Sequence, residues 1–252
     1  MPEPRPAVLV VEHEGPVGLG RLGPVLAATA DLDLRRLHRG DPLPAGLDGY
    51  AGLVVLGGTM GAGDDDVAPW LPATRRLLAA GVEADVPVLG ICLGAQLLAV
   101  AAGGRVERGS RGLEAGLVEV VATAAADGDP LLGPVTVRCG RRPAVPQFHQ
   151  DAVTVLPPGA VLLASGERYP HQAYRVGRRA WGLQYHPEVS AADFAGWVHG
   201  DLDAVTAAGL RAPDVLTAYA AAEPHLADLA TAHAEAFAAI MHSETVPAPS
   251  SP

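Results

Sequence analysis

The feature that most constrains the fold lies at residues 87–98, where an apolar strand-like run meets an apolar helix-like run. The residues read PVLGICLGAQLL, with Cys92 between Gly90 and Gly94. A strand that turns sharply into a helix strains the residue at the turn, and large side chains two positions to either side would clash. The pattern predicts a nucleophile elbow with Cys92 at its tip. The alternative is a buried cysteine between packing glycines.

The N-terminal half supplies the alternation of strands and helices that such an elbow needs. Short buried strands alternating with helices favour a parallel sheet with right-handed crossovers. The apolar patterns predict strands at 7–11, 32–37, 52–56 and 86–91, and helices at 21–30, 70–80 and 95–102.

The later part of the chain changes character. Shorter, more alternating runs separated by turn residues predict further strands, some of them antiparallel. These lie at 104–121, 135–139, 153–156 and 161–165, followed by a hairpin-like pair at 173–176 and 179–184. The remaining patterns are helical and cover 191–199, 201–208, 212–222 and 225–242. We expect one domain over 1–242, with a motif-bearing core at 7–189, a helical extension at 190–242 and a disordered tail at 243–252.

Composition excludes several classes of function. The net charge of −10 argues against broad attraction to nucleic acid or anionic membranes. No apolar run approaches the ~20 residues needed to span a bilayer, and the N-terminal residues do not resemble a signal peptide. The 2 cysteines are too few for a disulfide framework, so we expect a reducing cytoplasm.

A second motif supplies partners for a thiol nucleophile. His186 and Glu188 lie within WGLQYHPEV, at the end of a predicted strand. A thiol nucleophile needs an imidazole to accept its proton, and the imidazole needs a carboxylate to orient it. Residues i and i+2 of an extended segment point to the same side, and Pro187 stiffens the backbone between them. A surface turn with unrelated polar residues is the alternative.

A third element is the glycine pair that ends the strand at 52–56. Gly57 and Gly58 begin the sequence GGTMG. Without side chains they let the backbone approach a ligand closely and offer an N–H group. Taken alone, an ordinary strand-ending turn is the simpler interpretation.

Together, these three elements resemble the class I glutamine amidotransferases, the triad type with the order Cys, His, Glu. The matching pieces are GGTMG at 57–61, GICLGAQ at 90–96 and YHPEV at 185–189. Within the family, the chain is most similar to the GMP-synthetase-like stand-alone amidotransferase domains, through QFHQD at 147–151 and YPHQAY at 169–174. The fold expected is a flavodoxin-like three-layer α/β/α core with a central, mainly parallel sheet, with Cys92 at the carboxyl end of a strand.

The resemblance also implies roles for individual residues. Cys92 would attack the side-chain amide carbon of glutamine, His186 would transfer the proton to the departing ammonia, and Glu188 would orient His186. The backbone N–H groups of Gly58 and Leu93 would hold the oxyanion. Residues implied on the substrate side are Gln96, Gly57, His149, Asp151 and Gln172; for His149 and Asp151 a strand-end pair satisfying backbone groups is the alternative.

The chain departs from its relatives on the substrate side of the motifs. Thr59 stands where many relatives have Pro, Gln150 where the subgroup often has a small residue, and His171 where it often has Asn. None of these positions belongs to the triad. They bear on the identity of the glutamyl substrate more than on the type of reaction.

Three functions remain open on this basis. The first is hydrolysis of glutamine through a glutamyl thioester, with ammonia passed to an acceptor on a partner synthase or ligase. The second is a self-sufficient γ-glutamyl peptidase or hydrolase, and the third a catalytically silent regulatory or binding protein, against which the intact triad argues. The chain has no Lys, so it lacks a Gly-x-x-x-x-Gly-Lys phosphate loop, and we expect neither a cofactor nor a metal.

Other polar residues receive structural interpretations. The run Asp64–Asp66 is best explained as a solvated acidic loop, because consecutive carboxylates cannot all face one ion. Cys139 lacks an elbow and is interpreted as a bystander. Histidines 225, 233 and 242 are spaced for helix faces and are expected at the surface.

Overall fold

The computed structural model describes residues 5–15 and 17–243. Apart from Ser243, the predicted tail lies outside the described residues. The strands are β1 (Ala7–Glu12), β2 (Asp31–Arg36), β3 (Tyr50–Val55), β4 (Val88–Ile91), β5 (Arg105–Arg108), β6 (Glu114–Ala122), β7 (Ala144–His149), β8 (Asp151–Val155), β9 (Val161–Gly166), β10 (Ala173–Val176) and β11 (Ala180–Leu183). The helices are α1 (Leu22–Thr29), α2 (Leu71–Glu83), α3 (Leu93–Ala101), α4 (Leu132–Cys139), α5 (Ala191–Gly200), α6 (Leu202–Ala207), α7 (Ala212–Ala221) and α8 (Glu223–His242).

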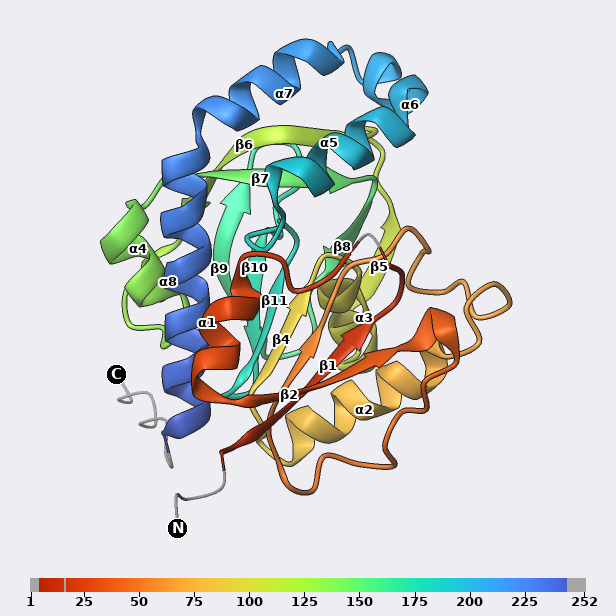
Figure 1. The fold of residues 1–252 in the computed structure, drawn as a ribbon, viewed down its shortest axis with the longest axis vertical. Helices are drawn as coiled ribbons and strands as arrows, with labels where there is room; N and C mark the ends of the chain where they lie inside the picture. The colour runs from red at the N-terminus through yellow and green to blue at the C-terminus, as the bar shows by residue number, and fades with distance from the viewer. Residues whose placement is uncertain (1–4, 16, 244–252) are drawn as a thin grey trace.

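The central sheet has the order β2-β1-β3-β4-β11-β10-β9-β6-β7. Its first five strands are parallel, and β10, β9, β6 and β7 extend it in antiparallel fashion. A separate two-stranded sheet joins β5 to β8. Helices cover both faces of the parallel part, as Figure 1 shows. The predicted α/β fold with a mainly parallel core is therefore confirmed.

Alternating side chains of the parallel strands build the two halves of the core. Val8 and Val10 of β1 face the cluster that contains the buried residues of α1 and α8. Leu9 and Val11 face the cluster on the side of α2 and α3. Because strand side chains point alternately to opposite faces, a strand covered on both faces must be apolar at every position, as β1 nearly is.

One predicted strand is a helix in the structure. Residues 135–139 belong to α4, whose first turn is fixed by Asp129: its Oδ1 accepts hydrogen bonds from the N–H groups of Leu131 and Leu132 at 2.9 and 3.0 Å. A carboxylate that caps backbone donors in this way favours a helix start. The prediction was wrong because a short apolar run fits a strand and a buried helix equally well.

The run predicted as one strand at 104–121 is divided. It forms β5 and β6, separated by a turn in which Gly112 has a φ of 74°. The two strands then join different sheets, because β5 pairs with β8 and β6 with β7 and β9.

Helix α8 packs beside α1 on one face of the sheet (Figure 1). Its His233 is fully buried, which contradicts the surface position expected for it. The ring accepts a hydrogen bond from the Tyr185 hydroxyl at 2.9 Å through Nε2, and Nδ1 donates to the Leu229 carbonyl at 2.8 Å. Among the described helices, none combines the length and apolar character that crossing a membrane requires.

Candidate active site

The elbow predicted from the sequence is present between β4 and α3. Cys92 has φ 50° and ψ −105°, a positive-φ conformation that is rare for a residue with a side chain. A Cβ on Gly94 would lie 2.0 Å from the Val55 carbonyl oxygen, and one on Gly90 would lie 2.5 Å from the Gly94 carbonyl oxygen. Glycine is therefore required at both positions by close backbone approach.

Neighbouring strand β11 fixes the cysteine from the other side. The Cys92 N–H donates to the Leu183 carbonyl at 2.7 Å, and the Gln184 amide nitrogen lies 3.6 Å from Cys92 Sγ. Cys92 is 6% exposed. Since β11 lies next to β4, the residues just past its end meet the sulfur.

His186 and Glu188 lie shortly past the end of β11, beyond Gln184 and Tyr185. His186 Nδ1 donates to Glu188 Oε1 at 2.7 Å, and the two side chains are 4% and 2% exposed. Burial lowers the pKa of His186, but the charges of Glu188 and Cys92 and hydrogen bonding to both outweigh it, so the net shift is upward. The carboxylate thus orients the ring and supports a positive charge on it.

The predicted oxyanion segment, Gly57–Gly61, is termed here the 57–61 loop. A Cβ on Gly57 would lie 3.1 Å from His186 Cε1 and 3.6 Å from Cys92 Cβ, so both residues lie against this one glycine. A Cβ on Gly58 would lie 3.0 Å from a methyl carbon of Leu93. The loop, the cysteine and the histidine are therefore brought together.

Residues outside the predicted motifs support the His186–Glu188 pair. The Arg21 N–H donates to the Glu188 carbonyl at 2.8 Å, and the Arg21 guanidinium donates to the Val189 carbonyl at 2.8 Å and pairs with Glu223. Trp197 of α5 packs against the imidazole. Sequence reasoning missed these residues because they lie outside the three motifs, in segments whose own patterns carry no sign of the site.

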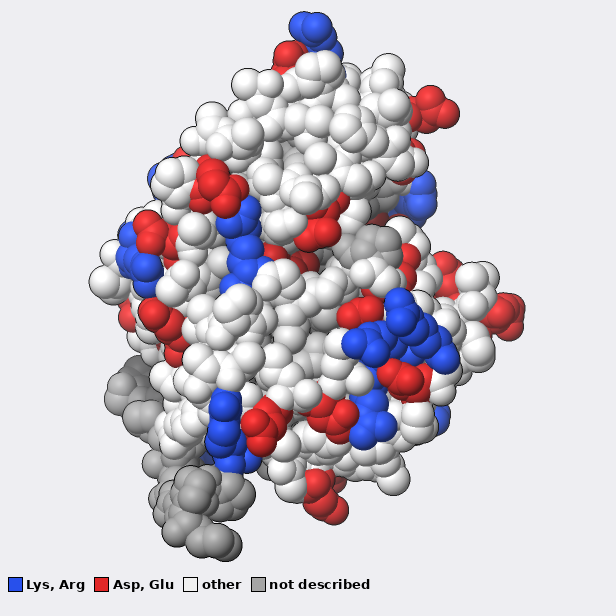
Figure 2. Space-filling view, in the orientation of Figure 1, with Lys and Arg blue, Asp and Glu red and all other residues white. Residues whose placement is uncertain are grey.

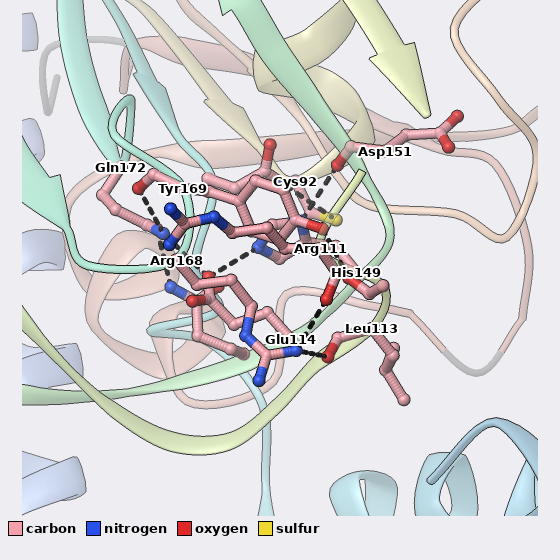
Figure 3. Close-up of polar contacts among 12 residues, drawn as sticks. Cys92, Arg111, Leu113, Glu114, His149, Asp151, Arg168, Tyr169 and Gln172 are labelled. Carbon is pink, nitrogen blue, oxygen red and sulfur yellow. Dashed lines mark hydrogen bonds and ion pairs between the residues drawn. The ribbon is translucent and has the colours of Figure 1, made fainter. Parts of the chain in front are cut away.

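Of the predicted substrate-side residues, all but Gly57 belong to a buried polar network, part of which Figure 3 shows. Gln96 Nε2 donates to the Asp151 carbonyl at 2.9 Å, and His149 Nδ1 donates to the same carbonyl at 2.9 Å. His149 Nε2 lies 3.0 Å from Glu114 Oε2, which also accepts from Gln172 at 2.8 Å. Since a carbonyl oxygen can only accept, Nδ1 carries a proton in this arrangement.

Asp151 enters this network through its backbone. In Figure 3 its carboxylate points away from Glu114, whereas its carbonyl oxygen faces the network. The carboxylate oxygen Oδ2 would lie 3.2 Å from a Cβ on Gly61, as would Oδ2 of Asp64. The Asp151 side chain therefore borders the 57–61 loop.

Glu114 and Gln184 were not predicted from the sequence. Glu114 is 2% exposed, and Gln184 joins the network by accepting from Gln96 at 3.3 Å. A signal was present for Gln184, which precedes YHPEV by one residue. Glu114 had none, because it lies in a run of alternating residues that is typical of any half-buried strand.

The remaining polar candidates lie apart from the cysteine. Asp65 pairs with Arg75 at 2.7 Å, and Asp64 and Asp66 are exposed, which agrees with a solvated loop. Burial and the charge of Asp228 raise the pKa of the Cys139 thiol despite Arg138, as suits a bystander. Among the described residues, no group of three or more His, Cys, Asp or Glu is arranged to hold a metal ion.

The surface shown in Figure 2 carries both signs of charge side by side. Surface ion pairs of the described residues include Arg35 with Asp33 at 2.7 Å and Arg21 with Glu223 at 2.7 Å.

The comparisons with known proteins agree with this geometry. Residues 30–196 match the family model for glutamine amidotransferase class-I. Gamma-glutamyl peptidase 5 of Arabidopsis thaliana is 36% identical over 158 residues, 62% of this chain and 61% of that protein. A glutamine-hydrolysing GMP synthase subunit of Methanosarcina mazei is 38% identical over 109 residues, 43% of this chain and 53% of that protein. The chain thus spans less than two thirds of the length of these relatives.

Two solved structures extend the likeness to nearly the whole chain. A glutamine amidotransferase from Thermotoga maritima has a TM-score of 0.81 and 28% identity, covering 95% of this chain and 99% of the other. One from Methylobacillus Flagellatus has a TM-score of 0.74 and 26% identity, covering 93% and 96%. The chain belongs to the class I glutamine amidotransferase family.

Proposed function

We propose that the protein hydrolyses a γ-glutamyl amide at Cys92, with glutamine as the first candidate substrate. The observation that carries the proposal is that the positive-φ cysteine of the elbow and the buried His186–Glu188 pair both lie against Gly57. A thiol, an imidazole and an orienting carboxylate form a complete set for covalent acyl transfer.

The reaction has two halves. Cys92 Sγ forms a bond to the γ-carbonyl carbon while His186 takes the thiol proton, and the oxyanion accepts hydrogen bonds from the N–H groups of Gly58 and Leu93. The C–N bond then breaks and His186 protonates the departing nitrogen. In the second half, water activated by His186 attacks the thioester, which releases glutamate and restores the thiol.

The second candidate is hydrolysis of γ-glutamyl peptides, where the leaving group is an amino acid or peptide in place of ammonia. The observation that favours it is the similarity to gamma-glutamyl peptidase 5, which covers 62% of this chain against 43% for the GMP synthase relative. With glutamine, ammonia could be passed to a synthase or ligase partner, a role suggested by the likeness to a glutamine-hydrolysing component of GMP synthase.

Glutamate release by the purified chain tests the proposal. We expect Cys92→Ala to lower the rate more than a hundredfold, because loss of a triad nucleophile typically costs several orders of magnitude. Cys139→Ala is the matched control and should remain within about twofold of wild type, since loss of a thiol outside the site removes no transition-state contact. Assays with glutamine and with a γ-glutamyl dipeptide, compared as kcat/KM, distinguish the two substrates. If the wild-type chain releases glutamate from neither, or if Cys92→Ala stays active, the proposal is wrong.

A further inference from the structure

The 57–61 loop is tied to the rest of the chain by side chains. Thr59 Oγ1 donates to Glu14 Oε2 at 2.9 Å, and the Gly61 N–H donates to Asp64 Oδ2 at 2.7 Å. Glu14 lies just past β1, and Thr59 follows the glycine pair past β3. The hydrogen bond between them therefore joins the ends of two adjacent parallel strands.

The two glycines of the loop are packed closely. A Cβ on Gly57 would lie 3.2 Å from Val17 Cγ1, in addition to its contacts with His186 and Cys92. Where Gly58 would carry one, Met60 Sδ lies at 2.6 Å and His13 Cβ at 3.2 Å. The space at both glycines is therefore tight, and a side chain at either position would have to displace its neighbours.

His13 packs against Gly58. It is fully buried, and its Nδ1 accepts a hydrogen bond from Trp70 Nε1 at 3.0 Å. Burial lowers its pKa to about 4, so the ring is neutral at neutral pH and suits this apolar position.

These contacts bear on the direction of the Gly58 N–H. An oxyanion donor is effective when it is already aimed at the developing charge, and a flexible glycine pair would otherwise have to be ordered in each turnover. Thr59 directly follows Gly58, so the hydrogen bond from Thr59 to Glu14 limits rotation of the peptide groups next to Gly58.

We propose that Thr59 and Glu14 are positioning residues that hold the 57–61 loop ready to receive the oxyanion, so that the site works without a second protein. This inference rests on the proposed hydrolysis at Cys92. If the chain is active without a partner, hydrolysis of a free γ-glutamyl amide or peptide is a better account of its function than delivery of ammonia to a synthase.

The first test is steady-state kinetics of the purified full chain with glutamine and a γ-glutamyl dipeptide. Thr59→Val, which removes the hydroxyl and keeps the shape, should lower kcat about tenfold with KM within about twofold, since a lost hydrogen bond to a charged group has roughly this effect. Thr59→Ser keeps the hydroxyl and should retain at least about half of the wild-type kcat, because the bond to Glu14 can still form.

The control is Thr154→Val. Thr154 donates to Glu107 at 2.6 Å, an equivalent Thr–Glu hydrogen bond between β8 and β5. This variant should keep wild-type kinetics. Equal kcat in Thr59→Val and wild type would overturn the inference, as would equal losses in Thr59→Val and Thr59→Ser, or an effect confined to KM.

Amide hydrogen exchange provides a readout that needs no turnover. In the isolated wild-type chain, the Gly61 N–H, which donates to Asp64 Oδ2 at 2.7 Å, should be protected from exchange, and Thr59→Val should make it exchange faster while Thr154→Val does not. Rapid exchange of the Gly61 N–H in the wild type would overturn the inference even if the enzyme is active. Absence of glutamate release from the wild type would instead refute the proposed hydrolysis, with loop order still measured by exchange.

Discussion

The imidazole of His186 packs edge-to-face against the indole of Trp197, with ring centroids 4.7 Å apart and planes inclined by 62°. Glu188 holds the same imidazole through Nδ1, so the ring is fixed by a carboxylate and by an aromatic neighbour. The electron-rich face of an indole also attracts a positively charged ring.

Replacing Trp197 should therefore loosen the imidazole. We expect Trp197→Ala to lower kcat about three- to tenfold, because an aromatic pair contributes about 0.5–1.5 kcal/mol beyond its buried area. Trp197→Phe keeps an aromatic partner and should retain more than half of the activity, on the same reasoning. The measurement is kcat at saturating substrate, with circular dichroism to confirm folding. Equal rates for wild type and Trp197→Ala would contradict this role.

Glu188→Gln should lower kcat by about 10²–10⁴, because an amide can stabilise the wrong tautomer of His186 and does not support its positive charge. Single-turnover glutamate release is the appropriate measurement. Glu119→Gln is the control, since Glu119 forms a surface ion pair with Arg142 at 2.6 Å and should leave the rate unchanged. If Glu188→Gln lowers the rate by less than about fivefold, the carboxylate has no role in the mechanism.

Substituting alanine for two glycines in different surroundings should change the stability of the fold in opposite directions. Gly94→Ala should destabilise the fold by about 3 kcal/mol or more, because its Cβ would lie 2.0 Å from the Val55 carbonyl oxygen. Gly196 lies within α5 with nothing within 4 Å of a Cβ, so Gly196→Ala should stabilise by roughly 0.5–1 kcal/mol. Urea unfolding at pH 7 measures both, and the close approach at Gly94 would be refuted if that variant kept wild-type stability.

Stability should fall as the pH falls from about 6.5 to about 4. Burial lowers the pKa of His13 and of His233 to about 4 from an ordinary value of 6.5, so in this window the unfolded chain binds protons that the folded chain does not. Each histidine then contributes stability that is full above pH 6.5 and is lost toward pH 4, of the order of 3 kcal/mol.

His233→Asn tests the sign and the size of this effect. Because His13 remains, the variant should lose only part of the slope of unfolding free energy against pH between 6.5 and about 4. Urea unfolding series of both proteins across this range give the two slopes. Parallel slopes would show that His233 does not titrate between the folded and unfolded states.

The parts of the site that sequence reasoning located are those encoded locally. The elbow depends on residues within two positions of Cys92, and His186 and Glu188 are two positions apart in one motif. A short pattern therefore reveals both, although the pair lies past β11 with Glu188 in a turn. Glu114 and Trp197 reach the site only through the register of β6 with β7 and the packing of α5, which no short pattern encodes. The same distinction explains α4, whose start depends on capping by Asp129.

Helix α8 has a consequence for how the chain folds during synthesis. It covers the face that includes β1 and α1, and a Cβ on Gly52 of β3 would lie only 2.6 Å from Met241 Sδ. Strand β1 therefore leaves the ribosome well before α8, and the apolar side chains of α1 stay uncovered until α8 has emerged. Nascent chains stalled before residue 223 should accordingly bind chaperones and be sensitive to protease, and this sensitivity should disappear once α8 has emerged.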